Sequence, residues 1–266
     1  MARDSQGARF GTVLITGATG GLGRELARRL AREADALVLT GTNAGALDEL
    51  AAELGRDADC RIEALACDLS QPGAASELVA AVTALGLEPD TLVNCAGFGY
   101  DAPFIESDPA RQRALVQVND MTLMELCRAL APAMAERGRG YILNVASIAG
   151  FLPGPQMATY YASKAFVQSF SQALHAELRA SGVHVTALCP GPVRTPFWER
   201  ADAAHTALAH LALPASAVAR AGVCALKWNK ALCVPGLFAE VVVLASRVLP
   251  RGLMGWFARL LQTRWR

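Results

Sequence analysis

The chain has 266 residues, which is enough for one large domain or two small ones with a sizeable buried core. Its 25 basic and 24 acidic residues leave a net charge of +1, so no general field attracts nucleic acid or an anionic membrane. The seven cysteines are scattered without a C-x-x-C pair, and the four histidines form no cluster with cysteines or carboxylates. We therefore expect no disulfide framework and no metal site, and a reducing, cytoplasmic location.

Membrane-directed segments are not expected either. Residues 1–17 contain no uninterrupted apolar region of the kind that a secretory signal needs. No stretch reaches the roughly 18 apolar residues of a spanning helix, because the closest one, residues 237–249, is broken by Glu240 and Arg247.

Short apolar runs alternate with longer segments of helical periodicity along most of the chain. The runs predict β-strands at residues 12–16, 36–40, 61–67, 91–94, 140–146 and 183–189. The periodic segments predict helices at residues 23–33, 44–54, 74–85, 113–137 and 157–181. Most of the strands are apolar on both faces, as parallel strands covered by helices on either side must be. The alternation predicts an α/β fold with a doubly wound parallel sheet, helices on both faces and a single domain.

The regular alternation of short apolar runs and helical segments ends after residue 190. Residues 191–213 predict an irregular loop followed by short helices, and a helix is expected near 214–228. Residues 231–236 are a candidate seventh strand, and the last thirty residues predict two helices separated at Pro250.

The first predicted strand runs into a glycine-rich turn, TVLITGATGGLGRELARRL, at residues 12–30. Glycines without Cβ atoms allow a sharp turn and a close approach to a pyrophosphate, and a helix beginning near Gly21 would direct free N–H groups at that anion. The position between the first strand and the first helix favours dinucleotide binding in a Rossmann-type fold. The alternative is a tight turn that binds no ligand.

This turn resembles the glycine motif of the short-chain dehydrogenase/reductase family. Residues Thr16–Gly23 satisfy both T-G-x-x-x-G-x-G, the pattern of the compact single-domain branch, and T-G-x-x-G-x-x-G, the pattern of the extended branch. The chain has no room for the large C-terminal domain of the extended branch, so the compact branch is favoured. The resemblance covers residues 11 to about 196.

Further along the chain, three motifs match family positions in part. Asp68 in ACDLS stands where the family contacts the adenine, although it or Ser70 could instead cap the next helix. NCAG (94–97) departs from the family's N-N-A-G at Cys95, which we expect to affect packing more than chemistry. CPGPVRT (189–195) matches P-G-x-V-x-T, the family's wall beside the nicotinamide.

The segment TYYASK contains two tyrosines, and either Tyr160 or Tyr161 could lie beside Lys164 on a helix. The family motif Y-x-x-x-K selects Tyr160, and Ser147 stands 13 residues upstream, close to the family's spacing. Asn119, in the middle of a predicted helix, matches the family's asparagine that lets the helix kink and holds a water. The resemblance thus implies a catalytic set of Asn119, Ser147, Tyr160 and Lys164. We expect the ammonium and the oxidised cofactor's ring to lower the pKa of Tyr160.

The resemblance also implies a set of cofactor-binding residues drawn from the strand ends. They are Thr16, Gly17, Thr19, Gly20, Gly21, Leu22, Gly23, Thr42, Asn43, Asp68, Leu69, Asn94, Ala96, Gly97, Tyr160, Lys164, Pro190, Gly191, Val193 and Thr195. The second strand ends in Gly41, Thr42 and Asn43 without the acid that NAD-dependent members carry, so NADP is preferred over NAD.

Within the single domain of residues 1–266, we expect residues 10–195 to form the core with these motifs and residues 196–266 to form a substrate lid and C-terminal helices. The pocket is expected between residues 98–100, 151–157 and 195–213, with Phe197 and Trp198 at the lid, and its apolar character favours a lipophilic ketone or alcohol. The basic, apolar tail suits either packing on the protein or on an oligomer partner, which we favour, or contact with an anionic membrane. The resemblance implies a homodimer or homotetramer.

These observations favour an NAD(P)-dependent oxidoreductase that transfers hydride between a nicotinamide cofactor and a ketone or secondary alcohol, with Tyr160 as general acid/base. The alternative is a regulator or scaffold of the same fold that binds dinucleotide without turnover. An epimerase or dehydratase of the extended branch is disfavoured by length.

Overall fold

The computed structural model describes residues 10–195, 197, 211–250 and 252–255. Its centre is a seven-stranded sheet in the order β3-β2-β1-β4-β5-β6-β9, in which every neighbouring pair is parallel. The strands are β1 (Thr12–Thr16), β2 (Ala36–Gly41), β3 (Arg61–Ala66), β4 (Thr91–Asn94), β5 (Gly140–Val145), β6 (Val183–Leu188) and β9 (Leu232–Cys233). The α/β class, the doubly wound sheet and the seventh strand are confirmed.

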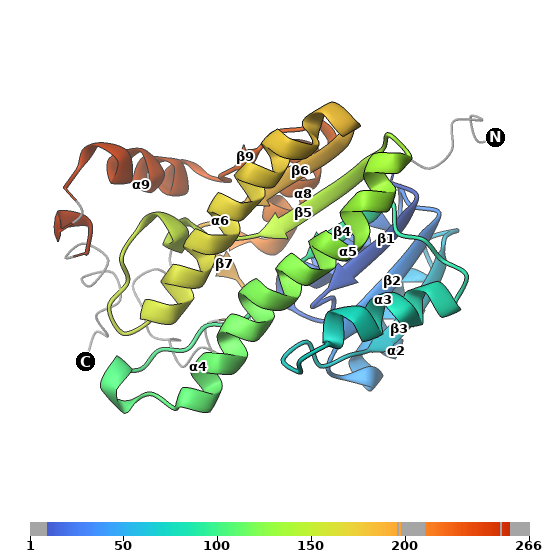
Figure 1. The fold of residues 1–266 in the computed structure, drawn as a ribbon, viewed down its shortest axis with the longest axis horizontal. Helices are drawn as coiled ribbons and strands as arrows, with labels where there is room; N and C mark the ends of the chain where they lie inside the picture. Colours follow the sequence, from blue (N-terminus) through green and yellow to red (C-terminus); the bar gives the residue numbers. More distant parts are fainter. Residues whose placement is uncertain (1–9, 196, 198–210, 251, 256–266) are drawn as a thin grey trace.

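Helices cover both faces of this sheet (Figure 1). One face packs against α1 (Gly21–Leu30), α2 (Ala44–Leu54) and α8 (Ala215–Lys227). The other packs against α3 (Ala74–Ala84), α5 (Leu123–Glu136) and α6 (Ala158–Leu178). Because α8 and β9 follow residue 195, the C-terminal part of the chain contributes to the same core as the strands that precede it.

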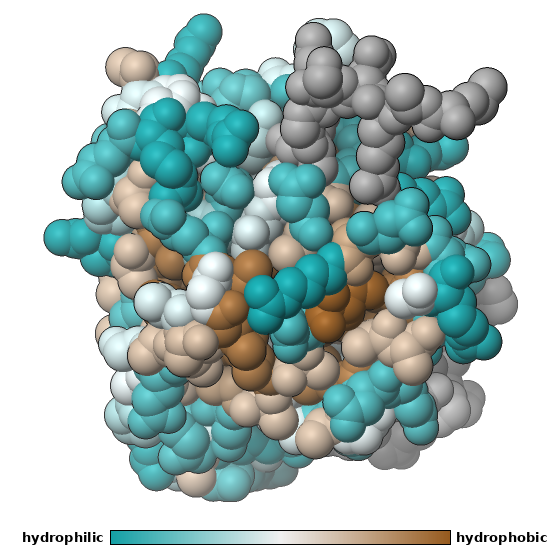
Figure 2. Space-filling model, turned by 90° about the vertical axis from the view of Figure 1, so that its right-hand side faces the viewer, coloured by the Kyte–Doolittle hydropathy of each residue, from teal (hydrophilic) through white to brown (hydrophobic). Residues whose placement is uncertain are grey.

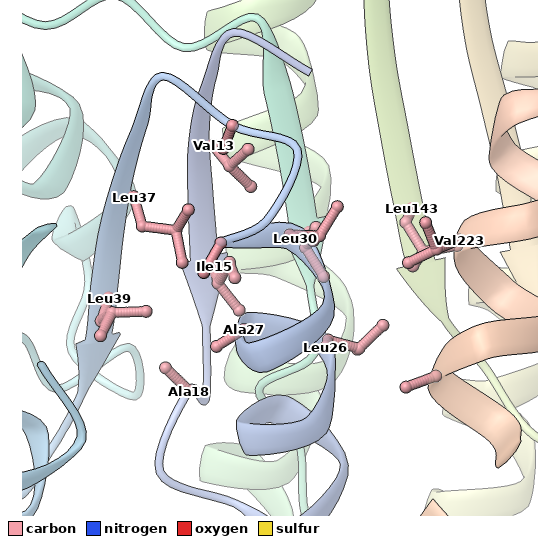
Figure 3. Packing of buried hydrophobic residues seen from close by; sticks show 14 of the residues in the cluster. Val13, Ile15, Ala18, Leu26, Ala27, Leu30, Leu37, Leu39, Leu143 and Val223 are labelled. Carbon is pink, nitrogen blue, oxygen red and sulfur yellow. The ribbon is translucent and has the colours of Figure 1, made fainter. Parts of the chain in front are cut away.

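Successive side chains of each strand point to opposite faces of the sheet, so the apolar strands contribute to both layers of the core. In β1, Val13 and Ile15 face α1, while Leu14 between them faces the opposite layer. Figure 3 shows Ala27 of α1 next to Ile15 of β1, while Leu26 of the same helix points away from β1 toward the side of Leu143 and Val223. This arrangement leaves only the ends of the strands for binding chemistry.

The expected single helix at residues 113–137 is longer and not uniform. It begins as α4 (Pro109–Val116), where Asp108 Oδ1 accepts a hydrogen bond from Ala110 N at 2.8 Å. It then passes through a π-helix (Gln117–Thr122) and continues as α5. A π-helical turn inserted into an α-helix is frequent at functional sites, and this one contains Asn119.

The C-terminal part adds two elements near the strand ends. β7 (Val193–Arg194) and β8 (Leu213–Pro214) form a two-stranded parallel sheet that the sequence did not predict. Helix α9 (Leu237–Val248) ends before Pro250, as expected. We also expected short helices within residues 191–213. Most of that segment, including Trp198, lies outside the described residues.

Figure 2 shows the molecule from the side of Figure 1 that carries β1 to β3, where hydrophobic residues form a band between hydrophilic surfaces. Such a band is what the edge of a covered sheet exposes. Across the parts of the chain that the structure describes, no helix has the length and apolar character needed to cross a bilayer.

Candidate active site

The candidate site lies where the strand order reverses, between β1 and β4. At this point the loops after neighbouring strands diverge to opposite faces of the sheet and open a crevice at the carboxyl ends of the strands. A cavity of about 510 Å³ occupies the crevice. It joins loops that follow all six strands from β1 to β6 with residues of α6 and α9.

Most of the residues expected from the sequence line this cavity. They are Gly17, Thr19, Gly20, Gly21, Leu22, Gly23, Thr42, Asp68, Leu69, Ala96, Gly97, Ser147, Tyr160, Lys164, Pro190, Gly191, Val193 and Thr195. Four others, Thr16, Asn43, Asn94 and Asn119, lie outside the lining and have structural partners instead.

In the glycine turn, backbone segments lie too close together to leave room for a side chain, and they form a cradle. Gly17 has a φ of +64°, and a Cβ there would lie 2.7 Å from Ala96 Cα. A Cβ on Gly23 would lie only 2.1 Å from the Gly17 carbonyl oxygen. Helix α1 begins at Gly21 with neither a capping side chain nor an acidic residue in its first turn. Free N–H groups, the helix dipole and the missing Cβ atoms together fit a dinucleotide pyrophosphate.

Thr16 and Asn94 fix the floor of the crevice. Thr16 Oγ1 accepts hydrogen bonds from Cys95 N at 3.1 Å and from Ala96 N at 3.0 Å, tying the ends of β1 and β4 together. The buried Asn94 Nδ2 donates to Asn144 Oδ1 of β5 at 2.9 Å. Asn94 therefore connects β4 to β5 and has no surface in the cavity, although we expected it to contact the cofactor.

At the far end of the crevice, Asn43 does not line the cavity as we expected, whereas Asp68 does. Asn43 caps α2, because its Oδ1 accepts from Ala46 N at 3.0 Å, which leaves Thr42 as the lining residue after β2. Asp68 and Ser70 do not cap α3, whose first residue follows Gly73. Instead, hydrogen bonds from the hydroxyl and amide of Ser70, and from Gln71, hold the pKa of Asp68 below its ordinary value.

Asn119 lies in the π-helix, and both polar atoms of its side chain form hydrogen bonds within the protein. Its Oδ1 accepts from Phe98 N at 3.1 Å, and its Nδ2 donates to Phe98 O and to Ser163 Oγ, each at 3.1 Å. These bonds hold the loop after β4 against α6. The expected break in helical geometry is present at this residue, while its side chain acts on the loop rather than lining the cavity.

Ser147 and Tyr160 meet over the cavity. Ser147 follows β5 in an extended conformation, its Oγ accepts from Ala149 N at 3.1 Å, and its side chain forms a hydrogen bond with Tyr160. Burial raises the pKa of Tyr160 above its ordinary value, and the Ser147 contact opposes this only in part. The expected lowering by Lys164 is therefore not supplied by the protein's own side chains.

The physical reason lies in the direction of the Lys164 side chain. Its Nζ donates to the Val145 carbonyl oxygen at 3.0 Å and lies 5.8 Å from the centre of the Tyr160 ring. Burial lowers the pKa of Lys164, and Asp120 is the strongest of the groups that oppose this change. The ammonium thus stands beside the cavity without a direct bond to the phenol.

The neighbouring Tyr161 packs on the loop before α6. Its ring lies so close to Gly154 that a Cβ there would be 2.3 Å from the ring carbons. The Tyr160 and Tyr161 rings meet edge to face with centroids 6.1 Å apart. Tyr161 also contributes to the cavity wall, so it is both a packing neighbour and a lining residue.

The end of the cavity beyond Tyr160 is mostly apolar. Phe98, Leu152, Met157 and Phe197 line it as expected, whereas Tyr100 and Phe151 do not. Residues missed from the sequence complete the wall: Asp101, Ala114, Val118, Ile148, Ala149, Phe238 and Val242. Phe238 and Val242 share one face of α9, a pattern visible in the sequence, but nothing local indicates that this face covers the site.

Among the described residues, no group of three His, Cys, Asp or Glu side chains is placed to hold a metal ion. The lining is instead that of a site for an organic ligand, with polar strand-end loops on one side and an apolar wall on the other.

Comparison with known proteins places this site in a family. Residues 11–206 match the family described as short chain dehydrogenase, and the chain belongs to it. The chain is similar to the very-long-chain 3-oxoacyl-CoA reductase of Rattus norvegicus, with 32% identity over 194 residues that cover 71% of this chain and 62% of the reductase. It thus spans about six tenths of that reductase's length.

Two solved structures extend the likeness over most of the chain. A short-chain dehydrogenase from Sphingobium yanoikuyae in complex with NADPH is 32% identical, with a TM-score of 0.79 and coverage of 92% of this chain and 94% of that one. A bulky-bulky ketone specific alcohol dehydrogenase from Comamonas testosteroni is 28% identical, with a TM-score of 0.74 and coverage of 91% and 93%. The family resemblance stated from the motifs is confirmed.

Substituting Gly23→Ala tests the cradle. The new methyl group would clash with the Gly17 carbonyl oxygen, so we expect the Kd for NADPH to rise at least about tenfold and the free energy of unfolding to fall by about 1–3 kcal/mol. Fluorescence titration and chemical denaturation measure the two effects. Gly45→Ala is the matched control, because its Cβ would meet nothing closer than Asn43 Oδ1 at 3.6 Å. Equal NADPH affinity in the two variants would contradict the assignment.

Proposed function

We propose that the protein is an NAD(P)-dependent oxidoreductase that interconverts a carbonyl group and a secondary alcohol. The observation that carries the proposal is the Tyr160 hydroxyl, bonded to Ser147 and placed in the same cavity as the glycine cradle. A dinucleotide bound along the cradle would supply the hydride. Membership in the short chain dehydrogenase family supports the same activity.

The residues divide the chemistry between them. Ser147 orients the substrate oxygen next to Tyr160, which stays protonated at neutral pH because burial raises its pKa. In the direction of reduction, Tyr160 donates its proton to the carbonyl oxygen as the carbonyl carbon gains hydride, and the double bond becomes a CH–OH group. Lys164 holds a positive charge beside the cavity, 5.8 Å from the centre of the Tyr160 ring.

We further propose that the substrate is lipophilic. Phe98, Met157, Phe197, Phe238 and Val242 surround the space beyond Tyr160 with apolar surface. The names of the similar proteins, a reductase of very-long-chain 3-oxoacyl-CoA and a bulky-ketone dehydrogenase, support a large apolar carbonyl compound. Burial of each methylene group in such a wall contributes about 0.8 kcal/mol.

NADPH is the proposed hydride donor. The position after β2 that would meet the ribose of the cofactor is Thr42, and it carries no negative charge to repel a 2′-phosphate. The similar Sphingobium dehydrogenase holds NADPH, which supports the same preference here.

The main rival function is a dinucleotide-binding scaffold without turnover. It needs the glycine cradle but has no use for Ser147 and Tyr160 at the junction of the cofactor and substrate spaces. The first of the following predictions separates the two functions.

Tyr160→Phe removes the hydroxyl while keeping the ring that packs on Phe197 at 5.6 Å. We expect kcat/KM for a reducible ketone to fall by about 10²–10⁴-fold, because the proton donor is lost, while NADPH binding is retained. Tyr161→Phe, the adjacent phenol, serves as the control and should keep most of its turnover. Undiminished turnover in the Tyr160 variant would remove this residue from the mechanism.

A series of 2-alkanones tests the substrate class. We expect kcat/KM to rise about fourfold with each added methylene group until the apolar wall is covered, since 0.8 kcal/mol corresponds to about that ratio. Loss of NADPH absorbance measures the rate. Turnover confined to small polar sugars would refute the lipophilic assignment.

Initial rates with NADPH and NADH test the cofactor. We expect NADPH to be preferred, and Thr42→Asp to lower kcat/KM for NADPH about tenfold or more by placing a carboxylate beside the 2′-phosphate. The rate with NADH should change less. A clear NADH preference in the unaltered protein would reverse the assignment.

A further inference from the structure

The π-helix holds a second buried polar residue besides Asn119. Asp120 is only 9% exposed, and its Oδ1 atom has no hydrogen-bond partner within the described part of the chain. In a regular helix, consecutive residues point in different directions, but the wider π-turn buries both Asn119 and Asp120. A buried carboxylate oxygen without a partner is costly and calls for a reason.

Among the described residues, the cation that acts on Asp120 is Lys164, the buried lysine of the candidate active site. Asn119, the residue that precedes Asp120 in the π-helix, and Lys164 reach the same corner of the site. A Cβ on Gly97 would lie 3.0 Å from Asn119 Oδ1 and 3.4 Å from Lys164 Nζ, so the π-helix and the ammonium flank the same glycine.

Other titratable groups around Lys164 come from the loops after two strands and from α6 itself. Cys95 follows β4, Cys189 follows β6, and Tyr160 precedes Lys164 on α6. Burial raises the pKa of Cys95 and of Cys189 to about 12, so both thiols are neutral near pH 7. The pKa of Tyr160 is raised as well. Among the groups that act on Lys164 in the described residues, Asp120 is thus the one that carries a negative charge at neutral pH.

We propose that Asp120 is a positioning residue of this site, whose buried carboxylate balances the Lys164 ammonium and keeps it charged beside the cavity. Without that carboxylate, the ammonium would be a buried charge with only the dipole of the Val145 carbonyl to stabilise it. The proposal goes beyond the oxidoreductase function and depends on it only for the kinetic measurement below.

The carboxylate is present at a net cost to folding. Burial raises the pKa of Asp120 well above that of an ordinary aspartate, to about 6, and attraction to Lys164 offsets this only in part. The folded protein therefore holds this proton more tightly than the unfolded chain does. The resulting stabilisation is full below about pH 4 and is lost as the pH rises through about 6. At pH 7 the charge destabilises the fold, as expected of a residue retained for the site rather than for packing.

The decisive experiment observes Lys164 directly. The chain has three lysines, Lys164, Lys227 and Lys230, so protein labelled with ¹³C-lysine gives few signals to assign. In the unaltered protein, we expect the Lys164 ¹³Cε shift to show a second inflection near pH 6, where Asp120 ionises. In Asp120→Asn, this inflection disappears and the main Lys164 midpoint moves to lower pH. A Lys164 titration without the inflection, and unaltered by the substitution, would overturn the proposal.

Kinetics and two further variants test whether charge at this position is what matters. In Asp120→Asn, we expect the alkaline limb of kcat/KM to move to lower pH; Asp120→Glu, which keeps the charge, should restore it. Glu125→Gln removes a charge five residues later and should leave the limb unmoved, since Glu125 is not among the groups that act on Lys164. If no ketone is turned over, the proposed function fails while the NMR titration still decides the pairing.

Thermal unfolding separates this role from a merely structural one. We expect Asp120→Asn to raise Tm at pH 7.5, where the buried charge is removed, and to give no gain at pH 4.5, where the carboxyl is largely neutral in the folded protein. A lower Tm at both pH values, together with an unmoved alkaline limb, would mean that Asp120 serves only packing and would refute the proposal.

Discussion

The close approach of the β1 and β4 ends is the constraint on which the site depends. Thr16 Oγ1 accepts from two consecutive amides, Cys95 N and Ala96 N, and Gly17 packs its bare Cα side against Ala96. A methyl group at Gly17 would separate the two loops, because it would lie 2.7 Å from Ala96 Cα. The same joint sets where α1 begins and where Gly97 meets Lys164. This contact between the two strand ends therefore fixes both the cradle and the floor beneath Lys164.

A series of hydrogen bonds between buried side chains connects the sheet to α6. Asn94 Nδ2 donates to Asn144 Oδ1 at 2.9 Å, and Asn144 Nδ2 donates to Ser171 Oγ at 2.9 Å. Buried hydrogen bonds of this kind are directional and costly to break, so they fix α6 against β4 and β5 more narrowly than apolar packing alone. Because Tyr160 and Lys164 lie on α6, that alignment determines their positions. Asn119 adds a second connection to α6 through its hydrogen bond to Ser163.

The parts that the sequence predicted are those encoded by local patterns. Apolar runs placed the six long strands to within about a residue, and the glycine turn and Y-x-x-x-K placed Gly17 and Tyr160 at one cavity. Asn43 also carried a local signal, since asparagine before a helix favours capping, and that signal prevailed over cofactor contact. The π-helix, the cover by α9 and the raised pKa of Tyr160 depend on residues distant in sequence, which no local pattern specifies.

The apolar wall and the acid are physically coupled. Phe197, 5.6 Å from the Tyr160 ring, and Met157, in the same apolar cluster, help to exclude water from the phenol, and that exclusion is the main cause of its raised pKa. The side chains that favour a lipophilic substrate therefore also keep Tyr160 protonated. Its ionisation then requires positive charge within the cavity, which the oxidised form of the cofactor would supply, since Lys164, 5.8 Å from the centre of the ring, does not lower the Tyr160 pKa. The proposed substrate preference and the proposed proton transfer consequently rest on the same few contacts.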